Sequence, residues 1–164
     1  MKNTEIRYTG GGVCAPSGFR AAGTACGIKG TIDKKDLALI VSDVMCSAAA
    51  VYTTNKVKGA PLKVTKDHIA DGKAIAVICN SGNANTCEIT ASNIGADKND
   101  IVVCSTGVIG QQLQMEPFER GIPELAKIAD YNGSASAAEA IMTTDTIPKE
   151  VAVEVSIGGK TCRI

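Results

Sequence analysis

Short apolar runs that end in polar turns limit most strongly how this chain can fold. The runs cover residues 37–41, 74–79 and 101–104 and consist almost entirely of Val, Ile, Leu and Ala. Apolar runs of roughly four to eight residues are typical of strands inside a sheet, whereas a buried helix needs a longer stretch. The sequence therefore predicts buried strands at the centre of the fold.

The C-terminal region predicts a hairpin. Residues 151–157 alternate apolar and polar side chains, as a strand with one exposed face does. Gly158-Gly159 can form a tight turn, and residues 161–164 would begin the return strand. At least one pair of strands is therefore expected to be antiparallel.

Helices are expected between the strands. Residues 116–130 and 136–142 favour helices, although Pro117 and Pro123 are expected to divide the first. This mixture predicts an α/β (α+β) fold in which layered mixed β-sheets are flanked by helices. The sequence contains no repeat or linker, so residues 1–164 are expected to form a single domain.

Other segments have weaker patterns. Residues 61–65 alternate in polarity, which favours a half-exposed strand, and Thr65 would cap a short helix over residues 66–70. Residues 47–52 fit either a strand or a short helix. Residues 10–19 begin with three glycines and predict a turn-rich entry segment.

Composition argues against several functional classes. Lys+Arg and Asp+Glu number 17 each, so the net charge is zero, and no basic stripe interleaved with aromatic residues suggests nucleic-acid binding. No apolar run approaches the roughly 18 residues that a membrane span requires. The N-terminal residues are polar and do not resemble a signal peptide. We expect a cytoplasmic protein that binds neither nucleic acid nor membranes.

The cysteines do not form a recognisable framework. The chain has 7 cysteines, an odd number, and no Cys-x-x-Cys pair, which disfavours both a disulfide scaffold and a zinc ribbon. Several, such as Cys79 and Cys104, lie in apolar runs, so we expect most to be small buried hydrophobic residues in a reducing compartment. With His68 as the one histidine, no multi-histidine metal site is expected, and His68 itself is expected at the surface or at a helix cap.

Two polar loops follow predicted buried strands. Residues 80–85, Asn-Ser-Gly-Asn-Ala-Asn, could aim amide dipoles into a cleft, although Asn side chains in turns commonly bond their own backbone. Residues 105–110, Ser-Thr-Gly-Val-Ile-Gly, could present a hydroxyl and a backbone N–H to one point, as an oxyanion hole requires. This loop could equally be a structural turn or a phosphate cradle, but no lysine follows in P-loop spacing.

A third polar segment follows the predicted helix at 136–142. Its residues, Thr143-Thr144-Asp145-Thr146, could hold a substrate ammonium or carboxylate, or could simply terminate the helix. A serine or cysteine nucleophile would depend on His68 as its base, and none of the cysteines stands out. Taken alone, the chain offers groups that could stabilise charge but no convincing nucleophile.

Six segments, in order along the chain, share the pattern of one family. They are residues 12–23, 35–43, 51–55, 80–85, 105–110 and 138–146. Together they resemble the ornithine acetyltransferase (glutamate N-acetyltransferase) family over nearly the whole chain. Matching segments in the same order are hard to obtain by chance, and the chain resembles the family's α-chain.

The resemblance implies a two-chain enzyme of arginine biosynthesis. Precursors in this family cleave themselves before a threonine, which becomes the N-terminal nucleophile of the β-chain and uses its own α-amino group as base. The present sequence ends before the family's Lys-Gly-Ser-Gly-Met segment and its Met-Ala-Thr cleavage site. The resemblance thus explains the missing nucleophile, and it implies an N-terminal-nucleophile-like fold completed by a β-chain, assembled as α2β2.

The resemblance also assigns individual roles. Thr106 and Gly107 match the family's oxyanion-hole pair, and Thr143 matches a substrate-binding threonine. The implied reaction is ping-pong transfer of acetyl from N2-acetyl-L-ornithine to L-glutamate through an acyl-enzyme on the β-chain threonine. No metal or organic cofactor is implied, although some members also take acetyl-CoA as acetyl donor.

The sequence departs from the family at Cys87–Glu88. The family carries a longer helical segment between the loops 80–85 and 105–110, whereas here Cys87 runs directly into residues 88–95. We expect residues to be absent there, either by deletion or because a segment is left out of the structure. An ordinary spacing of consecutive Cα atoms, about 3.8 Å, would exclude the second explanation.

Two other functions remain open on this sequence. A related self-cleaving acyltransferase or amidase would keep the fold and change the substrate. A non-catalytic subunit that binds a small ligand would also explain why no nucleophile is found.

Overall fold

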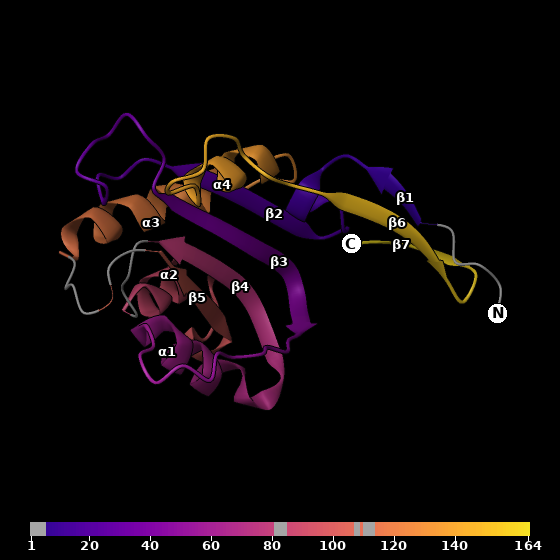
Figure 1. Ribbon diagram of the computed structural model, residues 1–164, viewed down its shortest axis with the longest axis horizontal. Helices are drawn as coiled ribbons and strands as arrows, with labels where there is room; N and C mark the ends of the chain where they lie inside the picture. The colour runs from indigo at the N-terminus through magenta and orange to yellow at the C-terminus, as the bar shows by residue number, and fades with distance from the viewer. Residues whose placement is uncertain (1–5, 81–84, 107–108, 110–113) are drawn as a thin grey trace.

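A four-stranded sheet forms the centre of the computed structural model, which describes residues 6–80, 85–106, 109 and 114–164 (Figure 1). Its strands lie in the order β2 (Phe19–Thr24), β3 (Leu37–Ser47), β4 (Lys73–Asn80) and β5 (Ile101–Ser105). β2, β3 and β4 pair antiparallel, whereas β4 and β5 pair parallel. The three predicted apolar strands are confirmed, and so is the mixed sheet.

A second, three-stranded antiparallel sheet extends away from the first (Figure 1). It contains β1 (Ile6–Thr9), β6 (Ala152–Ile157) and β7 (Lys160–Arg163). The predicted hairpin is therefore confirmed. Gly158 and Gly159 have φ angles of 58° and 79°, left-handed values that a two-residue turn of this type needs and that glycine adopts without strain.

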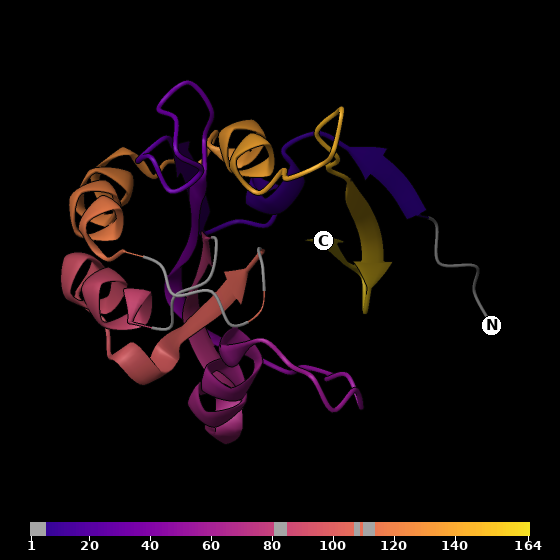
Figure 2. The ribbon, with the colours of Figure 1, turned by 60° about the vertical axis from the view of Figure 1, so that its left-hand side comes forward.

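Helices cover both faces of the four-stranded sheet (Figure 2). The helices α1 (Ala60–His68), α2 (Thr86–Ile94) and α3 (Glu116–Ile128) contribute side chains to the core on one face. The shorter α4 (Ser134–Ala140) packs on the opposite face, against β2 and β3. The predicted arrangement of sheets with flanking helices is confirmed, and no helix among the described residues is long and apolar enough to cross a membrane.

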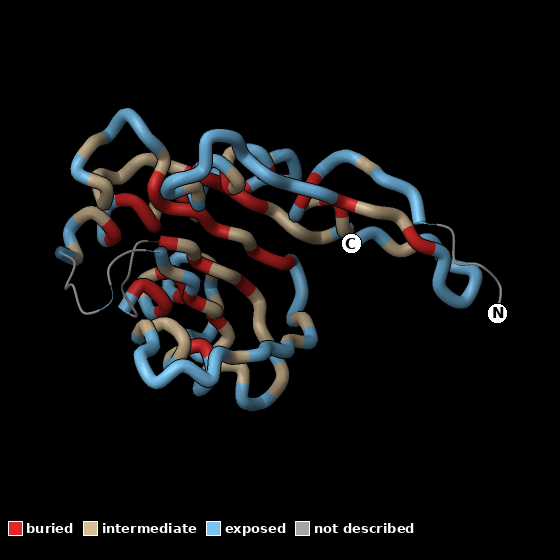
Figure 3. Tube along the Cα trace, viewed as in Figure 1, coloured by how far each residue is buried: buried red, intermediate tan, exposed pale blue. Residues whose placement is uncertain are grey.

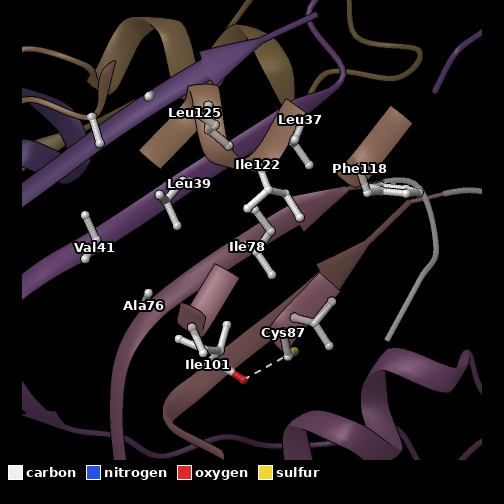
Figure 4. Close-up of a cluster of buried hydrophobic side chains, with 14 residues drawn as sticks. Leu37, Leu39, Val41, Ala76, Ile78, Cys87, Ile101, Phe118, Ile122 and Leu125 are labelled. Atoms are coloured by element: carbon white, nitrogen blue, oxygen red, sulfur yellow. Dashed lines mark hydrogen bonds between the residues drawn. The ribbon is translucent and has the colours of Figure 1, made fainter. Parts of the chain in front are cut away.

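Successive side chains of β3 point to opposite faces of the sheet, and both faces are covered, which explains why its apolar run is continuous. Leu37, Leu39 and Val41 point to the core shared with α2 and α3 (Figure 4), whereas the intervening Ala38 faces α4. A strand covered on both sides needs apolar residues at every position. Buried segments accordingly concentrate in this part of the chain (Figure 3).

The predicted strand at residues 61–65 is wrong, because this segment lies within α1. Pro61 stands in the first helical turn, where its missing N–H costs no helical hydrogen bond. Thr65 lies inside the helix and does not cap another one. Its hydroxyl donates to the carbonyl oxygen of Val103 at 2.9 Å and accepts from the Val103 N–H at 3.3 Å. The helix thereby satisfies backbone groups on the free edge of β5.

The expected division of the helix after residue 116 is also wrong. α3 continues from Glu116 to Ile128, with one proline in its first turn and Pro123 in its interior. An interior proline costs about 3 kcal/mol, but burying one large apolar side chain recovers about 1.5–3 kcal/mol. Phe118, Ile122 and Leu125 are all fully buried, so packing outweighs the local cost.

Other boundaries differ from the predictions more modestly. Residues 48–52 form neither a strand nor a helix, and β3 already ends at Ser47. α4 begins at Ser134, before the predicted start at residue 136. β1 and β2 were not predicted: β1 has only 4 residues, and the Ala and Gly residues of β2 carry little strand signal.

α2 runs without interruption across Cys87–Glu88. Within it the Thr90 hydroxyl donates to the Thr86 carbonyl at 2.7 Å, and the Ser92 hydroxyl donates to the Glu88 carbonyl at 2.9 Å. A continuous helix leaves no place for an omitted segment, so that explanation is wrong. Deletion relative to the family stays a prediction.

Glycines allow α4 to lie directly on β2. A Cβ on Gly23 would lie 2.0 Å from the Ser136 carbonyl oxygen, and one on Gly133 would lie 1.7 Å from the Ala21 carbonyl oxygen. At this contact the Ser136 hydroxyl donates to the Gly23 carbonyl at 3.0 Å. The close approach fixes the helix that leads directly into Thr143.

The expectation that most cysteines are buried is wrong. All seven are free thiols, but only Cys87 is buried; Cys104 is exposed, and the others are partly buried. α4 covers β2 and β3 and leaves part of this face of β4 and β5 open, which exposes Cys104. Local apolar patterning cannot show how far a helix reaches across a sheet.

Cys79 and Cys104 are partners in the parallel register of β4 and β5. A hydrogen bond from the Cys79 thiol to the Cys104 sulfur holds the pKa of Cys104 below its usual range. The same hydrogen bond, together with burial, raises the pKa of Cys79. Burial raises the pKa of Cys87 to about 11. Cys104 is therefore the thiol most readily ionised near neutral pH among these three.

Replacing Gly23 by Ala is expected to destabilise the fold, because the new methyl group would collide with the α4 backbone. Overpacking of this kind costs about 1–3 kcal/mol. Urea denaturation should show the loss as a lower midpoint. The matched control is Gly10→Ala, since a Cβ at Gly10 meets nothing within 4 Å; equal stability of the two variants would contradict the close packing of α4 on β2.

Alkylation by iodoacetamide should modify Cys104 well before Cys87. The thiolate is the reactive form, so labelling of Cys104 should already rise at a pH below the usual range of a thiol, whereas Cys87 should react appreciably only toward its pKa of about 11. Peptide mass spectrometry over a pH series measures both rates. Indistinguishable rates for the two cysteines near pH 7 would refute the thiol pairing.

Candidate functional site

The carboxyl ends of β4 and β5 bring two of the polar loops to one edge of the sheet. The Thr106 N–H donates to the Asn80 carbonyl oxygen at 2.9 Å, which continues the parallel pairing past the end of β5. In open α/β sheets, ligands commonly bind beyond the carboxyl ends of the strands. Residues 81–84, 107–108 and 110–113 lie outside the described residues, so the role of Gly107 stays a prediction.

The structure brings Thr106 and Thr143 into contact. The Thr143 hydroxyl donates to the Thr106 hydroxyl oxygen at 3.1 Å, although the residues are 37 positions apart in the chain. Thr106 follows β5, and Thr143 follows α4, which packs on the same sheet. Two residues with separately predicted roles thus lie at one point of the surface.

This contact determines which hydrogen-bond donors Thr106 can still offer. Its backbone N–H is already donated to Asn80, and its hydroxyl oxygen accepts from Thr143. A hydroxyl both donates and accepts, so the hydrogen of the Thr106 hydroxyl can still be directed at a further acceptor. Thr106 can therefore stabilise an oxyanion through its side chain and not through its backbone.

A cavity of about 320 Å³ opens beside Thr106, a size that suits a small ligand. It is lined by Asp36, Cys79, Asn80, Cys104, Ser105, Thr106, Ala140 and Ile141. A neighbouring cavity of about 430 Å³ shares Cys79 and Ile141 and has mainly apolar walls. Space for a small substrate therefore lies next to the predicted oxyanion residue.

Asp36 is the acidic group in the wall of this cavity, and it was not predicted as a site residue. It is only 2% exposed, and its carboxylate accepts from the backbone N–H groups of Cys26 at 2.8 Å and Lys29 at 3.1 Å. These bonds close the loop between β2 and β3. The carboxylate therefore organises the backbone, a role that a pattern of apolar residues around Asp36 cannot indicate.

The 80–85 and 143–146 loops are only partly directed at the site. The Asn80 side chain is buried and donates to the Thr86 hydroxyl at 3.0 Å, which supports a structural role for this residue. Asp145 forms an ion pair with Lys149, and the hydrogen bond from that lysine lowers the pKa of Asp145. Within the 143–146 segment, Thr143 is the residue that forms a hydrogen bond with Thr106.

His68 lies too far from Thr106 to act as its base. Its Nδ1 lies 2.8 Å from the carbonyl oxygen of Ile101, at the start of β5, whereas Thr106 follows the end of that strand. A strand of this length separates the two by roughly 13–17 Å. His68 is the last residue of α1 and links this helix to β5. Its position at the end of a helix is near what was expected of it.

The described residues contain no group of three or more His, Cys, Asp or Glu side chains that could hold a metal ion. Cys104 lines the cavity and has a lowered pKa, but among the described residues no hydrogen bond joins its thiol to a histidine or a carboxylate. The site on this chain therefore consists of a hydroxyl pair beside a cavity. Such a pair can stabilise charge and orient a substrate, and the roles expected of Thr106 and Thr143 stay predictions.

Comparison with known proteins gives one consistent result. The ArgJ family profile matches residues 20–164. The arginine biosynthesis bifunctional protein ArgJ of Symbiobacterium thermophilum is 44% identical over 173 residues, and that of Bacillus cereus is 46% identical over 164 residues. These alignments cover 97% and 92% of this chain but only 43% and 40% of the relatives, so the chain spans less than half of their length.

Solved structures agree. A crystal structure of arginine biosynthesis bifunctional protein ArgJ from Bacillus halodurans superimposes with a TM-score of 0.88 at 34% identity, covering 99% of this chain and 92% of the matched chain. Ornithine acetyltransferase from Mycobacterium tuberculosis, complexed with ornithine, gives a TM-score of 0.84 at 34% identity and coverages of 98% and 92%. In both sequence and fold, therefore, this chain belongs to the ArgJ family.

Proposed function

We propose that this chain is the α-chain of a two-chain glutamate N-acetyltransferase. The observation that carries the proposal is the 3.1 Å contact between Thr143 and Thr106 beside a small cavity. This contact supports the roles proposed for the two hydroxyls, an oxyanion donor and a substrate ligand, in a member of the ArgJ family. The similar ornithine acetyltransferase, whose crystal structure contains ornithine, supports the choice of substrate.

The comparison of chain lengths supports a two-chain enzyme. This chain covers 92% of each matched chain in the solved structures but only 40–43% of the curated relatives. Cleavage of one long precursor into shorter chains would produce this difference in length. We propose the same processing here, with a β-chain from the same precursor and an α2β2 assembly in the cytoplasm.

In the first half-reaction, the N-terminal threonine of the β-chain attacks the acetyl carbonyl of N2-acetyl-L-ornithine. Its α-amino group takes the hydroxyl proton. The carbonyl oxygen becomes negatively charged, and the Thr106 hydroxyl donates to it together with the backbone N–H of Gly107. Collapse of this intermediate leaves the acetyl group on the threonine and releases ornithine, whose departing amine takes up the proton.

In the second half-reaction, the amine of L-glutamate attacks the carbonyl carbon of the acyl-enzyme. The ester bond to the threonine breaks, the α-amino group passes the proton of the attacking amine to the threonine oxygen, and N-acetyl-L-glutamate leaves. The same oxyanion site is used, because the carbonyl carbon occupies the same position in both halves of a ping-pong reaction. Thr143 would bind substrate polar groups while it orients Thr106. No metal or organic cofactor is needed for these steps, and acetyl-CoA is proposed as a possible second acetyl donor.

One observation favours a different nucleophile. Cys104 lies in the same cavity wall as Thr106, and the hydrogen bond from Cys79 lowers its pKa, which favours the thiolate. Mixing the enzyme with N2-acetyl-L-ornithine and measuring the intact mass of each chain separates the two routes. Acetyl on a second chain supports the threonine mechanism, whereas acetyl on this chain would establish a cysteine acyl-enzyme.

Identification of everything that co-purifies with this chain tests the proposed architecture. Intact mass and N-terminal sequencing should reveal a second chain that begins with threonine. A complex without acetyl transfer from N2-acetyl-L-ornithine to L-glutamate would favour a related acyltransferase or amidase with another substrate. Absence of any second chain would favour the non-catalytic, ligand-binding role.

Thr106→Ala should lower kcat by roughly 10²–10³-fold, because one oxyanion donor is lost while the fold is kept. Steady-state kinetics of acetyl transfer measures the change. Thr106→Ser is the matched control, since it keeps the hydroxyl and should retain most of the activity. Near-normal turnover of the alanine variant would refute the assignment.

Thr143→Ala should mainly raise KM, because the variant loses a hydroxyl that is proposed to bind substrate. Thr161→Ala, on the exposed hairpin strand β7, is a control that removes a hydroxyl elsewhere. The kinetic assay should distinguish the two variants clearly. An unchanged KM in Thr143→Ala would remove this residue from the substrate site.

A further inference from the structure

A lysine far away in sequence holds the backbone next to Thr143. The Lys29 ammonium donates to the Met142 carbonyl oxygen at 2.6 Å and to the Lys35 carbonyl oxygen at 3.1 Å. Met142 directly precedes Thr143 and is 113 positions from Lys29. The side chain therefore ties the segment after α4 to the loop that precedes β3.

Lys29 is itself anchored to the central sheet. Its backbone N–H donates to the Asp36 carboxylate at 3.1 Å, and the other oxygen of that carboxylate accepts from the Cys26 N–H at 2.8 Å. The Asp36 N–H donates to the Thr24 carbonyl at 2.9 Å, between the ends of β2 and β3. Because Asp36 is buried, the lysine projects from a fixed base.

On its other side, the segment held by Lys29 contacts Thr106, the proposed oxyanion donor. Thr143 donates to Thr106, whose backbone N–H is bonded to Asn80 at the end of β4. Met142 and Thr143 therefore lie between Lys29 on one side and Thr106 on the other. Since hydrogen bonds from a charged donor are roughly twice as strong as neutral ones, the lysine contact is the stronger restraint on this segment.

We infer that Lys29 is a positioning residue, whose bond to the Met142 carbonyl sets the place of the Thr143 hydroxyl relative to Thr106. The inference rests on the proposed function for its effect on catalysis. Lys29 acts through Thr143, because its ammonium is bonded to two main-chain carbonyls. A shift of about 1 Å in a positioned group can cost about 10²-fold in rate, so such a restraint matters.

A second lysine of the same loop supplies a matched comparison. Lys35 forms an ion pair with Glu139 of α4 at 2.7 Å, so it too joins the loop to this region. Both of these side chains are substantially exposed, and exposed ion pairs contribute little. The two lysines therefore differ in what they hold: Lys29 holds the backbone before Thr143, and Lys35 holds a helix side chain.

The decisive experiment compares Lys29→Met and Lys35→Met in the complete enzyme, each alone and combined with Thr143→Ala. We expect Lys29→Met to lower kcat/KM about 10–100-fold, divided between kcat and KM as in Thr143→Ala. Lys35→Met should change it less than about twofold. In the Thr143→Ala background, Lys29→Met should cause little further loss, because residues that act as a unit are not additive.

Conservative replacement adds a control for folding. Lys29→Arg keeps donors for both carbonyls and should recover much of the activity that Lys29→Met loses. If Lys29→Met fails to fold, Lys29→Gln repeats the test with a shorter, uncharged donor. Activity of the methionine variant equal to that of Lys35→Met would overturn the inference, and so would losses that add fully to those of Thr143→Ala.

A readout independent of activity separates this inference from the proposed function. Hydrogen exchange of the backbone amides of residues 141–145 should become faster in Lys29→Met and stay unchanged in Lys35→Met. Inactive wild-type enzyme with this exchange pattern would refute the proposed function and keep the positioning role. Active wild-type enzyme with unchanged exchange in Lys29→Met would refute the positioning role alone.

Discussion

The parallel pairing of β4 with β5 is the constraint on which the candidate site depends. It aligns Asn80 with Ser105 and continues in the hydrogen bond from the Thr106 N–H to the Asn80 carbonyl. Because the carboxyl ends of parallel strands meet at one edge, both polar loops start from neighbouring points. The same pairing sets Cys79 beside Cys104 and so gives the cavity an ionisable thiol. A slip of the register would separate these groups.

The second part of the site is Thr143, which follows α4. α4 lies close to β2 because Gly23 and Gly133 leave room for backbone contacts, and the segment after the helix is then held by Lys29. The Thr143 hydroxyl meets Thr106 as a result. This arrangement places two hydroxyl groups from distant parts of the chain side by side at one edge of the sheet, where they can stabilise charge. It also explains why buried Asp36, which organises the loop of Lys29, matters for the site without belonging to its chemistry.

Much of the central sheet could be predicted, because runs such as 74–79 and 101–104 carry a local pattern that reports burial on both faces. Predictions failed where local patterns are ambiguous. Residues 61–65 alternate like a strand, yet Pro61 and the packing of Thr65 on β5 favour a helix. Pro123 should interrupt a helix, yet the buried side chains of α3 outweigh its cost. Cys104 was expected to be buried, and its exposure depends on the reach of α4, which no nearby residue encodes.

Sequence alone determined the family, the mixed sheet and the identity of Thr106 and Thr143 as candidate residues, because turns, apolar periods and ordered motifs are local properties of a chain. Only the tertiary structure decided that these two hydroxyls touch, that the Thr106 backbone N–H is already used, and that Lys29 holds the neighbouring backbone. Such contacts join segments up to 113 positions apart. Their distances follow from strand register and helix packing, which depend on the whole fold at once.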